Sequence, residues 1–402
     1  MSMAQKISAC WIVKNETLFL ARSLASVAGV ADEILVGDTG STDESIEIAQ
    51  NAGARVVKIP WNGSYADARN AVMAYATGSW ILFLDGDELL EPSHGALIRE
   101  LVENKEVEAY YLDRRHYLRA PSPVGLLPIS APLPPIPIDA LGYILTHDVR
   151  LFRASGRYFY QGRIHESLEG SLGAHQVSII RSSAIIHHFG PCKSDDQLVE
   201  KIAHYVSLAA KRYEQEPENW KALFDYAVEL SRAGYRDEAL LLLEKGLEIF
   251  PEQWEIHLEY GIFLHEAGRQ GEAIIALRSV VESRPHWVRG WHTLGLAFLR
   301  ESDLATAALC FEQCQLLSPD EGISLLNWGT SLLLQGDIPS AQDRFSRVET
   351  LFPQLPQATL GRRICEVLAG SITLAASELI PEDVTMFGGD TLWQALQSIR
   401  QP

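Results

Sequence analysis

The second half of the chain repeats a pattern of residues every 34 positions. Prolines, alanines and glycines keep this interval, at Pro217, Pro251, Pro285, Pro319 and Pro353, at Ala239, Ala273, Ala307 and Ala341, and at Gly261, Gly295 and Gly329. A small residue is required where the two helices of a repeat cross closely, and proline ends the second helix before the next unit begins. The pattern therefore predicts stacked helix pairs that form an all-α solenoid.

The first part of the chain has a different rhythm, because short apolar runs alternate there with amphipathic segments. The runs occupy residues 7–13, 33–38, 54–59 and 80–85, and strand-like text continues to about residue 190. This order predicts an α/β domain with a mostly parallel sheet that is covered on both faces. We expect this domain at 1–192, a connecting helix at 193–216, the repeats at 217–353 and capping helices at 354–402.

A proline-rich excursion interrupts the expected α/β domain at about residues 119–142. Seven prolines in this stretch exclude a helix and favour an extended, partly apolar segment. It is either a lid or acceptor-side loop or an insertion that only packs on the domain, and the sequence leaves both readings open.

The composition and net charge indicate which kinds of binding partner and which cellular location to expect. Hydrophobic residues make up 47% and charged residues 21% of the 402 residues, which is typical of a folded protein. A formal net charge of −18 argues against nucleic acid as a partner and favours a cation. The five cysteines lack the paired spacing of a metal site, and no apolar run is long enough for a signal peptide or a membrane span. We therefore expect a cytoplasmic protein with no transmembrane segment.

The fourth apolar run ends in a group of acidic residues. Asp85 and Asp87 stand two positions apart directly after this expected strand, and Glu88 follows them. Carboxylates at a strand end can hold a divalent cation, and the cation in turn can bind a diphosphate. An acidic turn without a ligand is the alternative, because such turns are common after strands.

Three segments upstream of and around this acidic group resemble a known family in their order and spacing. They read VKNE at 13–16, DEILVGDTGSTDESIEIA at 32–49 and WNGSYADARNAVMAYATGSWILFLDGDE at 61–88. Together they are similar to the family 2 glycosyltransferases, which have a GT-A fold, and in particular to bacterial members with C-terminal helical repeats. The 34-residue pattern from about Trp220 to Pro353 resembles the tetratricopeptide repeat (TPR).

The family resemblance implies a nucleoside diphosphate sugar as donor, with a UDP-sugar favoured, and Mn²⁺ or Mg²⁺ as cofactor. It implies donor-binding roles for Asn15, Glu16, Asp38, Asp67, Arg69, Asn70 and Asp85, and metal-binding roles for Asp87, His188 and Asp85. Structural roles are the alternatives: Asp38 as a turn residue before a helix, Arg69 in a surface salt bridge, and His188 as a structural histidine. Strand alternation allows only one of His187 and His188 to point into the site.

An acceptor group must lose a proton as it attacks the sugar, and the family uses a carboxylate well downstream of the acidic group for this step. The segment GRIHESLEG offers Glu166 and His165. Glu166 is the first candidate base, and His165 either takes this role or orients Glu166. The segment departs from the usual Glu-Asp form of the family motif, so a structural His-Glu pair is the alternative.

These expectations define two hypotheses about function. The first is a metal-dependent glycosyltransferase that transfers a sugar to an acceptor hydroxyl or thiol with inversion, and whose acceptor is a protein or peptide recruited by the TPR repeats. The second is a catalytically inactive GT-A/TPR scaffold that mediates protein–protein interactions. The first is favoured because an inactive domain would have no need to keep the whole set of expected site residues, Asp38, Arg69, Asp85, Asp87, Glu166 and His188.

Overall fold

The computed structural model describes residues 5–121, 125–129, 139–192 and 195–373, together with isolated positions between 379 and 397. Contacts divide the described chain into two compact units. Unit 1 contains the described residues of Met1–Tyr117 and Ile144–Glu229, and unit 2 those of Leu118–Ala131, Asp139–Tyr143 and Leu230–Pro402. The domain boundaries expected from the sequence rest on the repeat pattern, whereas these two units rest on contacts between residues. The expected boundaries remain predictions.

Unit 1 is built on an eight-stranded mixed sheet with the order β3-β2-β1-β4-β7-β6-β8-β5. The first four strands are mutually parallel and match the four apolar runs: β1 (Ile7–Val13), β2 (Glu33–Asp38), β3 (Arg55–Lys58) and β4 (Trp80–Phe83). The remaining strands are β5 (Glu88–Leu90), β6 (Ala109–Leu118), β7 (Gly142–Arg153) and β8 (Ile179–His188). Strand β7 is antiparallel to β4, and β5 is antiparallel to β8.

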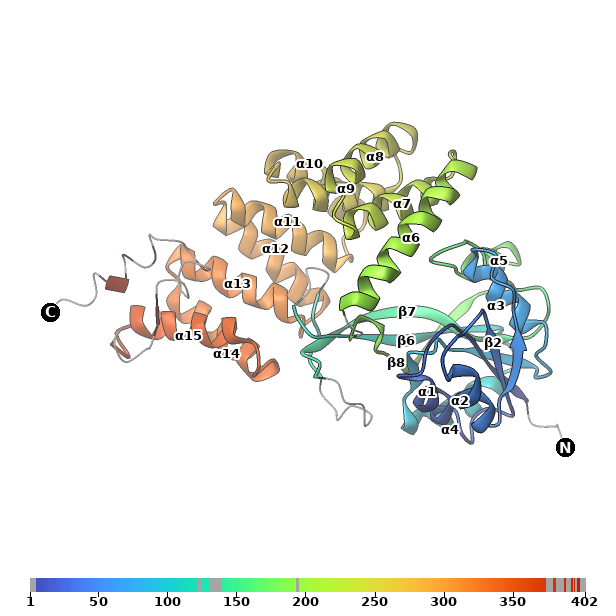
Figure 1. The fold of residues 1–402 in the computed structure, drawn as a ribbon. Helices are drawn as coiled ribbons and strands as arrows, with labels where there is room; N and C mark the ends of the chain where they lie inside the picture. Colours follow the sequence, from blue (N-terminus) through green and yellow to red (C-terminus); the bar gives the residue numbers. More distant parts are fainter. Residues whose placement is uncertain are drawn as a thin grey trace. The chain divides into compact units, whose positions relative to one another are not determined.

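Helices cover both faces of this sheet, as expected for its apolar strands. Successive residues of β1 point to opposite faces, so Cys10 and Trp11, both fully buried, enter two different core clusters. The Trp11 cluster includes residues of α1 (Leu20–Ser26), α2 (Ser45–Asn51) and α4 (Gly95–Val102), which lie together in Figure 1. The Cys10 cluster includes residues of α3 (Tyr65–Met73) and α5 (Glu169–Ala174).

Two further helices, α6 (Asp195–Gln215) and α7 (Trp220–Arg232), follow the sheet in sequence and belong to unit 1 up to Glu229. Leu208 and Ala209 of α6 are buried in a small core with Ile164, and the partly buried ring of Tyr65 packs against this core. The first helices of the α-helical region are therefore part of the unit that carries the sheet.

Unit 2 contains the remaining helices, and their ends follow the 34-residue pattern. They are α8 (Arg236–Ile249), α9 (Trp254–Glu266), α10 (Gln270–Ser283), α11 (Val288–Arg300), α12 (Leu304–Leu317), α13 (Gly322–Gln335), α14 (Ile338–Leu351) and α15 (Pro356–Leu368). Each of α8, α10, α12 and α14 ends two residues before one of the repeated prolines. The predicted α/β domain followed by an all-α solenoid is confirmed (Figure 1).

The repeated glycines lie where paired helices come closest. A Cβ atom at Gly295 of α11 would lie 2.7 Å from the Phe311 ring of α12, and one at Gly329 of α13 would lie 2.9 Å from the Phe345 ring of α14. These approaches are too short for any side chain. The small residues of the pattern are therefore required by helix packing, as the sequence predicted.

Part of the proline-rich excursion, residues 122–124 and 130–138, lies outside the described residues. The part that is described packs within unit 2. The Leu126 amide donates to Glu321 Oε1 at 2.8 Å, and the Gly322 amide donates to the Leu126 carbonyl at 2.9 Å. Leu126 and Leu141 are buried in a core cluster with Phe352. In the described part of the chain, no helix combines the length and the apolar character that crossing a membrane requires.

Candidate active site

A cavity of about 700 Å³ opens in unit 1, at the carboxyl ends of β1 and β4. Its walls also include residues of β6 and β7, the segment 160–169, and helices α6 and α7. The sequence-predicted residues that line it are Glu16, Arg69, Asp85, Asp87, His165, Glu166 and His188. The fold thus brings together side chains that the sequence separates by as many as 172 positions, from Glu16 to His188.

The turn that follows β4 positions the acidic residues. The Asp85 amide donates to Glu88 Oε2 at 2.9 Å, and the Glu88 amide donates to the Asp85 carbonyl at 3.0 Å. Gly86 lies between them against Glu16, since a Cβ at this position would be 2.5 Å from Glu16 Cγ. The glycine therefore lets the turn pass close to the segment after β1, and Asp85 and Asp87 reach the cavity.

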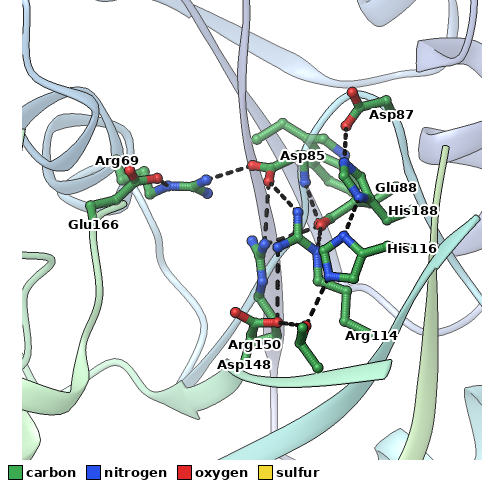
Figure 2. A network of polar contacts seen from close by, with 12 residues as sticks. Arg69, Asp85, Asp87, Glu88, Arg114, His116, Asp148, Arg150, Glu166 and His188 are labelled. Atoms are coloured by element: carbon green, nitrogen blue, oxygen red, sulfur yellow. Dashed lines mark hydrogen bonds and ion pairs between the residues drawn. The ribbon is translucent and has the colours of Figure 1, made fainter. Parts of the chain in front are cut away.

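Asp85 lies at the centre of a network of guanidinium groups (Figure 2). Arg69 Nη2 lies 2.6 Å from Asp85 Oδ1, and Arg150 Nη2 and Arg114 Nη2 lie 3.2 Å and 3.6 Å from Asp85 Oδ2. Burial alone would raise the pKa of Asp85, but these three arginines outweigh it and hold the pKa well below its usual value. Asp85 is therefore an anion at neutral pH, and it shares Arg114 and Arg150 with the buried Glu88 carboxylate.

Arg69 connects this network to Glu166. Helix α3 begins at a serine N-cap, Ser64, whose hydroxyl accepts from the Asp67 amide at 3.1 Å, and Arg69 follows in the next turn. Arg69 Nε lies 2.5 Å from Glu166 Oε1, and its guanidinium lies over the Phe83 ring at 4.5 Å. The residue is only 5% exposed, so its ion pairs are buried and are not the surface bridge considered as the alternative. Within the described residues, Arg69 Nη1 is buried and makes no hydrogen bond.

Asp87 and His188 lie side by side at the other end of the network (Figure 2). Antiparallel pairing of β5 with β8 places Glu88 opposite His188 and brings His188 Nε2 to 3.6 Å from Asp87 Oδ1. His188 Nδ1 lies 2.8 Å from Nδ1 of His116 on β6. Burial lowers the pKa of His188 well below its usual value, and burial together with Arg114 lowers the pKa of His116 to about 3. Both imidazoles are therefore neutral at neutral pH.

The neighbouring His187 points away from this site, as strand alternation predicted. Its Nε2 lies 2.8 Å from Glu91 Oε2, and its Nδ1 lies 2.7 Å from the Tyr117 hydroxyl. The side chain is 2% exposed. His187 therefore packs in the interior, and only His188 reaches the cavity.

The three predicted metal ligands do not converge. In the described part of the chain, no group of three or more His, Cys, Asp and Glu side chains is arranged to hold a metal ion. Asp85 faces arginines, which leaves the pair Asp87 and His188. A Cβ at Gly190 would lie 2.5 Å from His188 Nε2 and 2.9 Å from Asp87 Oδ2, so the glycine leaves open the space beside both donor atoms. An oxygen and a neutral nitrogen next to such a space fit a divalent cation whose other ligands come from a diphosphate.

The other predicted donor-binding residues lie outside the cavity lining. Asp38 accepts from the amides of Gly40 and Ser41, at 3.3 Å and 2.9 Å, and Asn15 Oδ1 accepts from the Thr42 amide at 2.8 Å. The side-chain oxygens of both residues thus accept hydrogen bonds from nearby backbone amides, as is common in turns.

Asp67 and Asn70 of α3 are held in a similar way. Asp67 Oδ2 accepts from Asn62 at 2.7 Å. The Asn70 side chain bonds to both the amide and the carbonyl of Tyr160, at 2.8 Å and 2.9 Å. Asn70 thereby fixes the start of the segment that carries the predicted base.

The two candidate bases lie in a tight loop. Gln161 and Ser167 form a β-bridge with backbone hydrogen bonds of 2.9 Å and 3.0 Å, and the loop between them contains His165 and Glu166. His165 has a φ of 48°, in the left-handed region that a side chain other than glycine adopts only at a cost. Its Nε2 lies 2.9 Å from Oε1 of Glu229 on α7. The two bases therefore have different partners, because Glu166 contacts Arg69 and His165 contacts α7.

Several residues of the cavity and of its polar contacts were not anticipated from the sequence. These are Arg114, His116, Asp148 and Arg150 on β6 and β7, and Lys201, Tyr205, Lys221 and Glu229 on α6 and α7. One signal was available for the strand residues, because charged side chains within expected strands either face water or form a buried network. For α6 and α7 no signal was available, since their pattern predicted only helices.

Comparisons with known proteins agree with the family resemblance. Residues 8–150 match the family model for glycosyl transferase family 2, and residues 227–286 match a tetratricopeptide repeat model. Both resemblances indicated by the motifs are confirmed. The chain therefore has a region that matches family 2 glycosyltransferases, followed by a region that matches tetratricopeptide repeats.

Two curated relatives each align with slightly more than half of this chain. A TPR repeat-containing protein of Synechococcus elongatus is 32% identical over 227 residues, which are 55% of this chain and 49% of that protein. The SPbeta prophage-derived glycosyltransferase SunS of Bacillus subtilis is 25% identical over 238 residues, 59% of this chain and 52% of that protein. The chain thus spans about half the length of these relatives.

Among solved structures, the chain is similar to YrrB, a TPR protein with an unusual peptide-binding site. The two are 16% identical, with a TM-score of 0.39, and the match covers 48% of this chain and 98% of that one.

Proposed function

We propose that the protein is a glycosyltransferase that moves a sugar from a nucleoside diphosphate donor to an acceptor hydroxyl or thiol. The observation that carries the proposal is one cavity in which Asp85, Asp87, Glu166 and His188 lie together with buried arginines. The match of residues 8–150 to glycosyl transferase family 2 supports it. We infer a UDP-sugar as the favoured donor from the family resemblance.

The cationic side chains of the cavity suit the diphosphate of such a donor. Lys14, Arg114 and Arg150 line it, and Arg69 presents a buried Nη1 that has no hydrogen bond within the described residues. Arginine binds phosphate oxygens through parallel hydrogen bonds, so these groups can orient the donor. Asp87 and His188 would hold Mn²⁺ or Mg²⁺, which neutralises charge on the departing nucleoside diphosphate.

Sugar transfer then proceeds as a direct displacement. The acceptor oxygen or sulfur attacks the anomeric carbon from the side opposite the diphosphate and gives its proton to a base in the 161–167 loop. The new bond to the sugar forms as the bond to the β-phosphate oxygen breaks, and the nucleoside diphosphate leaves with the electron pair. A single displacement of this kind inverts the anomeric centre. Glu166 and His165 both line the cavity and are the two candidates for the base.

The repeats of unit 2 suit a role in recruiting the acceptor. Tetratricopeptide arrays bind extended peptides and protein segments along their surfaces. We therefore propose a protein or peptide acceptor that the repeats recruit, and a cytoplasmic location, where nucleotide sugars are made.

A thermal-shift and hydrolysis screen tests the proposal. The full chain would be incubated with UDP-, GDP- and dTDP-sugars, with and without Mn²⁺ or Mg²⁺, and the release of nucleoside diphosphate would be measured. Asp87→Ala is the site variant, and Asp113→Ala is the control, since Asp113 pairs with the exposed Arg181 outside the cavity lining. We expect metal-dependent stabilisation and slow hydrolysis by the wild type and by the control, and neither by Asp87→Ala.

The screen also separates the two functional hypotheses. A wild-type protein that gains stability from a donor with metal but never hydrolyses it would favour the inactive scaffold. No response to any donor in the presence of metal would contradict the proposal altogether.

A further inference from the structure

A buried carboxylate of the first repeat helix lies against a candidate catalytic base. Glu229 of α7 is fully buried, with 0% exposure, and its Oε1 lies 2.9 Å from His165 Nε2. The His165 side chain is 36% exposed and lines the cavity. Both residues belong to unit 1. The contact therefore joins a helix to the predicted catalytic loop, and both lie C-terminal to the matched residues 8–150.

The 34-residue pattern shows that helix packing does not require a charge at this position. The equivalent residues of α9, α11 and α13 are Phe263, Ala297 and Ser331, each spaced by 34 residues from the one before. All three are buried, with exposures of 9%, 0% and 0%, and none is ionisable. Burying an ionised carboxylate is costly unless it is paired and hydrogen-bonded. The contact of Glu229 with His165 is therefore one that stacking of the repeats does not require.

The surroundings of His165 fit a base that is held in one orientation. Its backbone φ of 48° is kept by the β-bridge between Gln161 and Ser167, and its ring lies 6.0 Å from the ring of Tyr205 on α6. Strained backbone of this kind persists only where the surrounding structure holds it in place, as at functional sites. Glu166 is already engaged, since its Oε1 lies 2.5 Å from Arg69 Nε. To act as the base, the Glu166 carboxylate would have to accept the acceptor's proton while it is still paired with Arg69.

We propose that Glu229 is a positioning residue that orients His165 as the acceptor-side base. The inference rests on the proposed glycosyl transfer. With its proton on Nε2, the imidazole donates to Glu229, and Nδ1 then carries the lone pair that takes the acceptor proton. As the acceptor oxygen or sulfur bonds to the anomeric carbon, His165 becomes an imidazolium that the Glu229 carboxylate stabilises. The leaving diphosphate keeps the electron pair of the broken bond. The α6–α7 helices are thus part of the catalytic apparatus rather than a linker.

The test compares Glu229→Gln with Glu259→Gln in the full chain. Glu259 of α9 is also a buried glutamate of a repeat helix, with 6% exposure, but it pairs with Arg289 and lies outside the cavity lining. The assay follows nucleoside diphosphate release from the donor that the wild type hydrolyses, with water as acceptor. We expect Glu229→Gln to lower kcat about 100-fold with the donor KM within about twofold. Glu259→Gln should keep the wild-type kcat.

A second comparison uses His165→Ala alone and combined with Glu229→Gln. If Glu229 acts through His165, adding Glu229→Gln to His165→Ala should change kcat less than twofold, because residues that act as one unit are not additive. A wild-type kcat in Glu229→Gln, a raised KM with kcat preserved, or a full further loss in the double variant would each overturn the inference while leaving glycosyl transfer intact. A wild type that hydrolyses no donor would overturn the proposed function and this inference together.

Discussion

The buried charges around Asp85 carry a large desolvation cost. Arg69 and Arg150 are each 5% exposed and Glu88 is fully buried, so solvent contributes little to their stabilisation. Such charges are tolerated only when each is paired and hydrogen-bonded. The network therefore depends on all of its members, and removing one leaves the others buried without compensation.

Replacing Arg69 with methionine tests this dependence. The change would leave Asp85 and Glu166 without the guanidinium that lies 2.6 Å and 2.5 Å from them. We expect the free energy of unfolding to fall by about 3–5 kcal/mol, because breaking a buried ion pair strands a buried charge. Urea unfolding followed by circular dichroism measures the loss.

The matched control for Arg69→Met is Arg181→Met. Arg181 also pairs with an aspartate, Asp113, but its side chain is 57% exposed. Because the guanidinium of this pair faces solvent, the pair should contribute less than about 1 kcal/mol. Equal losses for the two variants would mean that the Arg69 network does not depend on burial.

For single residues, the sequence predicted which side chains belong to the site better than it predicted their hydrogen-bond and ion-pair partners. The chemistry of Asp85, Asp87 and His188 follows from their places at strand ends, which fix both position and direction. Their partners depend on side-chain packing across the sheet: Arg69 and Glu166 are 97 positions apart, and no periodicity predicts that they meet. For Asp38 the turn considered as the alternative is present, because amides two and three residues later are always within its reach.

At the scale of elements, the glycines of the repeat pattern make a direct prediction. Gly295→Ala would place a Cβ 2.7 Å from the Phe311 ring, so α11 and α12 would have to move apart. We expect the free energy of unfolding to fall by about 1–3 kcal/mol, as is usual for overpacked cores. Thermal and urea unfolding of the full chain measure this.

A glycine in open space provides the control for Gly295→Ala. At Gly271 of α10, a methyl group would meet no atom of a neighbouring element within 4 Å among the described residues. Alanine there should raise the free energy of unfolding by up to about 1 kcal/mol, because alanine has the higher helix propensity. A stabilised Gly295→Ala variant would contradict the role assigned to the repeated glycines.

The buried His265, in the last turn of α9, predicts a dependence of the free energy of unfolding on pH. Burial lowers the pKa of His265, despite a hydrogen bond of 2.8 Å between its Nδ1 and Gln270 Oε1. Below the unfolded value of about 6.5, the unfolded chain binds a proton that the folded chain binds only at lower pH. The contribution of His265 to the free energy of unfolding is therefore fully present above pH 6.5, the unfolded value. It is lost as the pH falls below that value, by at most about 1.4 kcal/mol per pH unit.

Between pH 7 and pH 5, His265→Asn should flatten this loss relative to the wild type. The measurement is the free energy of unfolding at half-unit steps of pH, compared between the two proteins. Identical slopes would show that His265 does not titrate differently in the folded and unfolded chains.

The elements themselves could be predicted to different degrees. The repeated prolines gave the ends of α8, α10, α12 and α14 because proline cannot continue a helix. Strand β5 was not predicted, since Glu88–Leu90 is too short to show a period and pairs with a strand almost a hundred residues later. Yet β5 places Asp87 beside His188. The element that assembles the site is thus the one with the weakest local signal.

At the scale of the whole molecule, the contacts and the sequence pattern divide the chain differently. The pattern places the first repeat with the later ones, whereas α6 and α7 share a compact unit with the sheet as far as Glu229. Long-range contacts such as that of Glu229 with His165 cause the difference. Because repeat periodicity reports only on neighbouring helices, it carries no information about contacts of this kind.

Hydrogen–deuterium exchange of the full chain tests this division. Every residue that lines the proposed donor cavity belongs to unit 1. A UDP-sugar with Mn²⁺ at about 100 times its dissociation constant should stabilise the unit that binds it by about 2.7 kcal/mol. We therefore expect slower exchange in peptides covering residues 84–90, 160–169 and 201–229, and unchanged exchange in α9 through α14. Asp87→Asn should abolish the protection. Equal protection across α9 through α14 would contradict a site confined to unit 1, and it would mean that donor binding stabilises the repeats as well.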